Sequence, residues 1–168
     1  MLGFYEAFPE NIHMTENFTS SLSSRKLQQR IIQVFQDINR KKFSFEEIGS
    51  PSVPQCTIIF EIGIADSRSF NYLNPEETRR VLDVLRKESL DVMDFFCVMR
   101  YYKIRGQKKT PLKFDYYMIR SVFGEKRVGF QVFHERGPRY VSPQDVIAFF
   151  VDKANETSDK RILKLESA

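Results

Sequence analysis

Three stretches of the chain repeat apolar residues at helical spacing. The first predicts a helix over residues 24–41 and carries a stripe made of Leu27, Ile31, Val34, Phe35 and Ile38. The second and third, residues 75–88 and 143–155, each follow a capping side chain, Asn74 or Ser142, and open on a proline. A polar cap before a proline at the first helical position is typical of a helix start.

Four other stretches alternate apolar and polar residues, which predicts strands over 56–65, 92–105, 112–123 and 127–136. The last three are joined by the short segments GQKKT and GEK. Connections of this length favour hairpins, so we expect these three strands to form an antiparallel meander.

The predicted order of elements is therefore α-β-α-β-β-β-α. We expect an α+β fold in which a four-stranded, mostly antiparallel sheet has its helices packed on one face. One domain would span residues 23–156. Residues 1–22 would form an N-terminal arm, whose apolar start suggests docking, and residues 157–168 a polar C-terminal tail.

Strand alternation divides the meander residues between two faces. One face is the more apolar, and we expect it to pack on the helices. It comprises Phe96, Val98, Arg100, Tyr102, Ile104, Leu112, Phe114, Tyr116, Met118, Arg120, Val128, Phe130, Val132 and His134.

The other face carries an apolar patch that includes Phe95, Ile119, Phe123 and Phe133. Large bare apolar patches are rare on soluble proteins, so we expect something to cover this one. The arm or tail, a second copy of the chain in a homodimer, and a ligand or nucleic-acid strand are the alternatives.

That same face is basic and aromatic near the tip of the first hairpin. Its candidate residues for nucleic-acid or ligand binding are Tyr101, Lys103, Arg105, Lys108, Lys109, Lys113 and Tyr117. Single-stranded nucleic acids bind open sheets by stacking bases on aromatic rings and holding phosphates with Lys and Arg. The net charge of +4 and pI near 9.1 favour this only slightly. Alternatively, the lysines simply keep a hairpin edge soluble.

Enzymatic chemistry has less support. His13, His134, Cys56 and Cys97 share no metal-ligand spacing, and no glycine-rich phosphate loop occurs, so we expect no metal site and no cofactor. We name no catalytic residue. A small enzyme with a site around Arg100, Arg120 and His134 remains an alternative, because buried arginines need an anionic partner.

The first residues contain no apolar run long enough to predict an export signal, no window is apolar enough to predict a membrane span, and both cysteines lie in apolar runs. We therefore expect a cytoplasmic protein with no membrane association. Our leading hypothesis is a non-enzymatic module that binds RNA, DNA or a phosphate-rich ligand. The alternative is a self-associating structural or protein-interaction domain that uses the apolar patch.

Overall fold

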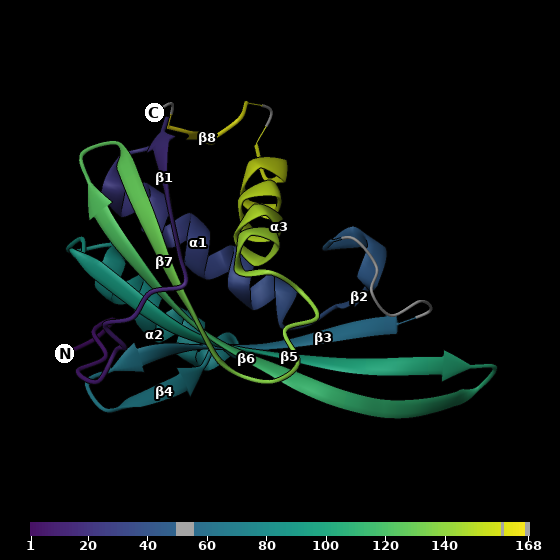
Figure 1. The fold of residues 1–168 in the computed structure, drawn as a ribbon. Helices are drawn as coiled ribbons and strands as arrows, with labels where there is room; N and C mark the ends of the chain where they lie inside the picture. Colours follow the sequence, from purple (N-terminus) through teal and green to yellow (C-terminus); the bar gives the residue numbers. More distant parts are fainter. Residues whose placement is uncertain (50–55, 159, 167–168) are drawn as a thin grey trace.

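In the part of the chain that the structure describes, the sheet has eight strands, so the predicted four-stranded sheet is wrong. The computed structural model describes residues 1–49, 56–158 and 160–166 (Figure 1). The strands are β1 (Met14–Ser20), β2 (Lys42–Ser44), β3 (Cys56–Asp66), β4 (Ser69–Tyr72), β5 (Val92–Arg105), β6 (Lys108–Gly124), β7 (Arg127–Arg136) and β8 (Leu163–Leu165). They follow the order β2-β3-β5-β6-β7-β1-β8, with β4 paired to β3, and each of these ladders is antiparallel.

The four strands that the pattern missed are short or polar. β2, β4 and β8 contain three or four residues each, too few to show a two-residue period. β1 has the sequence MTENFTS, with only two large apolar side chains. β1 lies within the segment predicted as an arm and β8 within the predicted tail, of which residues 159, 167 and 168 lie outside the described part.

The described residues form three α-helices where helical spacing predicted them: α1 (Ser24–Ile38), α2 (Pro75–Leu85) and α3 (Pro143–Glu156). A 3₁₀ turn, η1 (Phe45–Glu47), follows β2. The side chains of Ser23, Asn74 and Ser142 each accept a hydrogen bond from a backbone N–H in the first turn of their helix. Polar caps and prolines therefore fix where α2 and α3 begin, as the sequence indicated.

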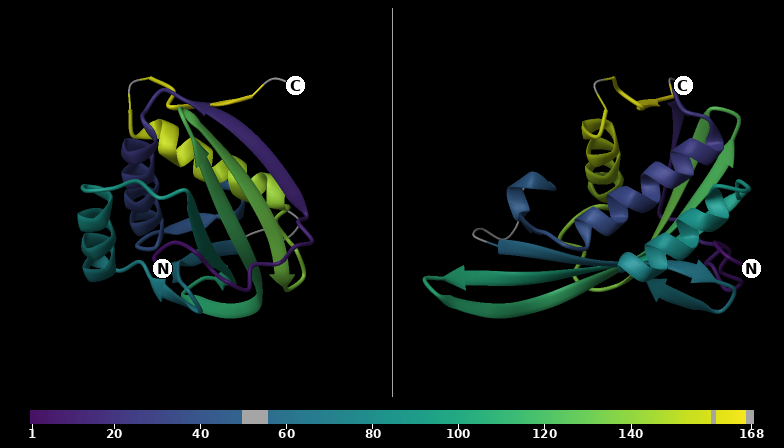
Figure 2. Two further views of the ribbon diagram at one scale, coloured as in Figure 1. Left: turned by 90° about the vertical axis from the view of Figure 1, so that its left-hand side faces the viewer. Right: turned by 180° about the vertical axis from the view of Figure 1, so that it is seen from behind.

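The sheet bends, and α1 and α3 lie inside the bend (Figure 2). The ring of Phe35 in α1 packs edge-on against Phe95 of β5 at 4.7 Å and against Phe150 of α3 at 4.8 Å. Phe149 of α3 stacks on Phe60 of β3 at 5.4 Å. The α+β class with an antiparallel sheet is thus confirmed. The β5–β6 hairpin continues beyond the helices as a two-stranded ribbon (Figure 1).

The start of the chain docks on the side of the sheet away from the helices. Asp94 is fully buried and receives two hydrogen bonds from Arg120, from Nε at 2.8 Å and Nη2 at 2.9 Å. The backbone N–H of Tyr5 donates to the same carboxylate at 2.8 Å. The guanidinium of Arg120 also lies over the rings of Phe4 and Phe8. One buried ion pair therefore fastens the first residues to β5 and β6.

Candidate nucleic-acid interface

The two faces of β5 and β6 are the reverse of the sequence prediction. Tyr101 and Tyr117 are fully buried on the side that carries the helices, while their neighbours Tyr102 and Tyr116 lie on the outer side. For β7 the prediction was right, because Val128 and Val132 are buried beneath the helices. Tyr101 and Tyr117 are therefore not available to stack on a ligand.

The register of the ladders explains this reversal. Ile119 of β6 lies opposite Val132 of β7, and Tyr117 lies opposite His134, so they share the buried face. The sequence prediction instead grouped the β7 residues with Met118 and Arg120. Irregularities in pairing fall between Arg100 and Tyr102, and between Tyr116 and Tyr117. A one-residue change in register exchanges the two faces of a strand, and alternation within each strand does not fix how neighbouring strands align.

The helices themselves cover most of the predicted apolar patch. Phe95 is fully buried against Phe35, and Ile119 is 1% exposed. Phe123 is partly buried against the core, and Phe133 is half-buried with His13 stacked on its ring at 4.7 Å. Phe95 and Ile119 therefore cannot meet a second copy. The helices cover them, while His13 of the predicted arm lies on Phe133, so the prediction of one patch under a single cover is corrected.

The Asp115 carboxylate of β6 lies at the centre of a buried cluster of hydrogen-bonded polar groups. Tyr101 Oη donates to Asp115 Oδ2 at 2.5 Å, and His134 Nε2 lies 2.8 Å from Oδ1. The backbone N–H groups of Arg139 and Tyr140 donate to the same carboxylate at 2.7 and 3.0 Å. Asp115 is fully buried, so these bonds replace the water it has lost. They also hold the turn that follows β7 against β6.

Tyr101 and Tyr117, the two buried tyrosines, have hydroxyl groups that resist deprotonation. Burial raises the pKa of the Tyr101 hydroxyl, and the Asp115 carboxylate beside it raises that pKa further. Burial likewise raises the pKa of Tyr117, whose hydroxyl donates to the carbonyl oxygen of Val141. The Cys97 thiol is also fully buried, which raises its pKa. Each group therefore stays protonated at neutral pH and serves the packing of the core.

The outer side of β5–β7 carries alternating cations and aromatic rings, which we call the outer strip. It comprises Arg100, Tyr102, Lys109, Phe114, Tyr116 and Arg136, together with Lys113, which lines the same groove as Phe114. Three of its cations lie over its rings: Lys109 over Tyr102 at 4.1 Å, Arg100 over Phe114 at 5.1 Å and Arg136 over Tyr116 at 5.8 Å.

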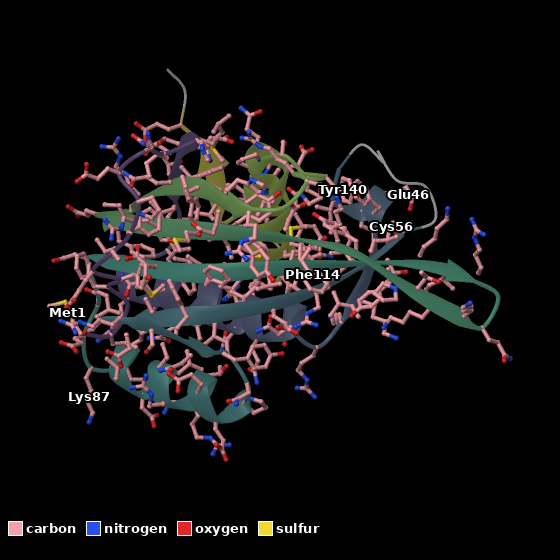
Figure 3. All side chains as sticks on the ribbon, turned by 60° about the horizontal axis from the view of Figure 1, so that its bottom comes forward. Met1, Glu46, Cys56, Lys87, Phe114 and Tyr140 are labelled. Carbon is pink, nitrogen blue, oxygen red and sulfur yellow. The ribbon has the colours of Figure 1, made fainter. Side chains whose placement is uncertain are left out.

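Phe114 marks the place where the hairpin leaves the body of the protein (Figure 3). A groove of about 440 Å³ lies beside it, between β6 and the turn after β7. Its lining consists of Lys113, Phe114, Tyr116, Arg136, Gly137 and Pro138. The rings of Phe114 and Tyr116 are 6.4 Å apart and nearly perpendicular, at 84°. The groove therefore combines two aromatic walls with two cations.

The predicted basic residues lie along the projecting ribbon. Arg105, Lys108, Lys109 and Lys113 are exposed, and Lys103 is half-buried beside Cys56 of β3. Lys109 and Lys113 join the outer strip, whereas Arg105 and Lys108 face each other at the tip. The sequence has six Lys and Arg but no Asp or Glu between Asp94 and Asp115. The ribbon is therefore a uniformly positive extension.

Sequence reasoning missed Tyr102, Phe114, Tyr116 and Arg136 as surface residues. The signal was available, because the tyrosine pairs guarantee that one ring of each pair points outward whichever face is buried. The outward ring could be chosen only by knowing that Tyr117, not Tyr116, shares a face with the buried residues of β7.

Arg100, Arg120 and His134 do not converge on one site. Arg100 Nε lies 2.9 Å from a carboxylate oxygen of Glu61, while Arg120 pairs with Asp94 and His134 with Asp115. Each side chain therefore has its own carboxylate partner, which satisfies a polar group that is buried or half-buried. This arrangement does not support the alternative of a small enzyme built on these three residues.

Over residues 1–49, 56–158 and 160–166, no cluster of His, Cys, Asp and Glu side chains is suited to hold a metal ion. No helix within these ranges has the length and apolar character needed to cross a membrane. Cys56 and Cys97 are both free and buried. No protein-family model, curated protein or solved structure matches this chain.

Proposed function

We propose that this protein binds nucleic acid through the outer strip and the basic β5–β6 ribbon. The observation that carries the proposal is that Arg100, Lys109 and Arg136 share one surface with the three half-exposed rings of the outer strip. Phosphates bind lysine and arginine electrostatically, and bases stack on aromatic rings and guanidinium planes. The outer strip offers both contacts on one continuous surface.

A role in keeping the hairpin soluble would explain its exposed lysines but not the aromatic rings of the outer strip. A hairpin edge is kept from aggregating by charge, and exposed lysines at the tip would suffice for that role. Tyr102, Phe114 and Tyr116 contribute apolar area to the solvent side, which such an edge does not require. The combination favours a surface that meets a ligand with both negative charge and flat apolar groups.

Binding is tested by titrating the protein into a fluorescein-labelled mixed-sequence oligonucleotide and following anisotropy at several salt concentrations. We expect binding at low salt that weakens as salt rises, because phosphate neutralisation releases counterions. The variant Lys108→Gln/Lys109→Gln/Lys113→Gln should bind at least roughly tenfold more weakly. Its salt slope should fall by about 0.7 for each lost phosphate contact to a single strand.

A matched control separates a local site from net charge. Lys126, Lys160 and Lys164 are also exposed, but they lie in the β6–β7 turn and next to or within β8, away from the ribbon. Their triple replacement by Gln removes the same charge and should leave affinity nearly unchanged. No binding by the parent protein at low salt, or equal losses in the two triple variants, would overturn the proposal.

A further inference from the structure

The groove between β6 and the turn after β7 points to the class of nucleic acid. We infer, on the basis of the proposed function, that the groove holds one unpaired base and that the ligand is single-stranded. Phe114 and Tyr116 meet at 84°, so their rings form a corner rather than a parallel stack. A corner accepts one flat group, with its face on one ring and its edge against the other.

Of the two rings, we assign the base to Tyr116, whose ring also packs against Phe96 at a centroid distance of 5.8 Å. The face of Phe114 is occupied by the guanidinium of Arg100, which is also held by Glu61 at 2.9 Å. Arg136 lies farther from its ring, 5.8 Å from the Tyr116 centroid. Among the described residues, neither Arg136 nor Lys113 forms an ion pair with a carboxylate. Arg136 is exposed and can therefore cover the outer face of a base, while Lys113 meets the adjoining phosphate.

The far wall of the groove is held in place before any ligand arrives. A Cβ atom at Gly137 would lie 2.2 Å from the carbonyl oxygen of Phe114, so the turn packs directly on the β6 backbone. Asp115 then fixes the next residues through the N–H groups of Arg139 and Tyr140. A preformed site loses little conformational freedom on binding, and this favours capture of a base.

A duplex cannot use this corner. Bases in a double helix are stacked on both faces, and stacking on a protein ring requires an unpaired base. Duplex DNA or RNA would therefore meet only the lysines and arginines of the ribbon, with no contribution from the corner. The groove predicts a preference for single strands at equal length and equal salt.

The experiment uses a single-stranded oligonucleotide that carries the fluorescent base 2-aminopurine, and the same oligonucleotide annealed to its complement. We expect the full-length protein to bind the single strand more tightly and to quench the 2-aminopurine fluorescence by stacking. Tyr116→Ala should remove the quenching and weaken single-strand binding by roughly tenfold to a hundredfold, the range for losing one stacked base. Its duplex binding should hardly change.

A second variant guards against a folding defect. Tyr116→Phe keeps the ring and should retain the quenching, and circular dichroism checks that Tyr116→Ala is folded. Equal affinity for single strand and duplex, or no quenching by the parent, would overturn this inference while leaving nucleic-acid binding intact. No binding of either oligonucleotide would overturn the proposed function as well.

Discussion

Tyr101 and Tyr102 are adjacent in β5, yet they belong to opposite sides of the protein. Tyr101 is fully buried and donates a 2.5 Å hydrogen bond to Asp115. Tyr102 is half-buried on the outer strip beneath the ammonium group of Lys109. The first residue therefore belongs to the core, and the second to the proposed binding surface.

Removing one hydroxyl at each position should separate these roles. Tyr101→Phe takes a donor away from the buried Asp115 carboxylate and should lower the free energy of unfolding by about 1–3 kcal/mol. Tyr102→Phe removes a surface hydroxyl and should change the free energy of unfolding by no more than about 0.5 kcal/mol. Urea unfolding followed by circular dichroism measures both values, and a larger loss in Tyr102→Phe would contradict this assignment of the faces.

The buried tyrosines also predict instability in alkali. Because burial raises the pKa of Tyr101 and Tyr117 above their unfolded value, the unfolded chain releases these protons first. The two protonated hydroxyls contribute fully to the free energy of unfolding below about pH 10, the ordinary tyrosine pKa. Above that pH their contribution decreases by about 1.4 kcal/mol per pH unit for each group.

Urea unfolding of the parent and Tyr101→Phe between pH 8 and 11 tests this dependence. Tyr101→Phe should start from a lower free energy of unfolding but lose less of it above pH 10, because one of the buried groups with a raised pKa is absent. Parallel decreases in the two proteins would show that Tyr101 does not hold its proton in the folded state.

The Arg120–Asp94 pair should control docking of the first residues. Arg120→Met leaves the fully buried Asp94 carboxylate without its cation, and breaking such a pair costs about 3–5 kcal/mol. Hydrogen exchange should accelerate at the amide of Tyr5, which donates to Asp94. The control Arg127→Met breaks a more exposed pair with Glu166 and should cost at most about 1 kcal/mol. Unchanged hydrogen exchange at Tyr5 in Arg120→Met would contradict the conclusion that this ion pair holds the first residues on β5 and β6.

Gly137 should tolerate no side chain, unlike a glycine at the ribbon tip. Its φ of 113° and its contact with β6 combine backbone strain with a clash, so Gly137→Ala should lose more than the ~1–3 kcal/mol of strain alone. Gly106 has a φ of 62° and open space around its Cβ position, so Gly106→Ala should lose only about 1–2 kcal/mol. Thermal unfolding compares the two, and equal losses would show that the turn is not packed as described.

The sequence predicted the helices better than the sheet because their signals are local. Asn74 with Pro75 and Ser142 with Pro143 mark the helix starts within two adjacent residues of the sequence. Strand pairing depends on partners far along the chain, and β8 pairs with β1 across more than 140 residues. A three-residue strand such as β2 has no pattern of its own and exists because β3 offers it an edge.

The sequence placed the basic candidates on the β5–β6 ribbon but chose the tyrosines that lie on the buried side. The basic ribbon was visible because Lys103 to Lys113 are close in sequence. The sequence did not show which of Tyr116 and Tyr117 points outward. Both faces of β6 carry large apolar residues, so polarity did not distinguish the solvent face from the buried face. The deciding fact, that Tyr117 lies opposite His134, is a property of the pairing register.

The outer strip is tested most directly by NMR. The chain has a mass of 19.9 kDa, so amide signals can be followed while a single-stranded oligonucleotide is added. We predict shifts concentrated at Tyr102, Lys109, Lys113, Tyr116 and Arg136, with little change in α1 and α3. No shifts at low salt, or shifts concentrated outside the ribbon and the outer strip, would contradict the proposal that this face binds nucleic acid.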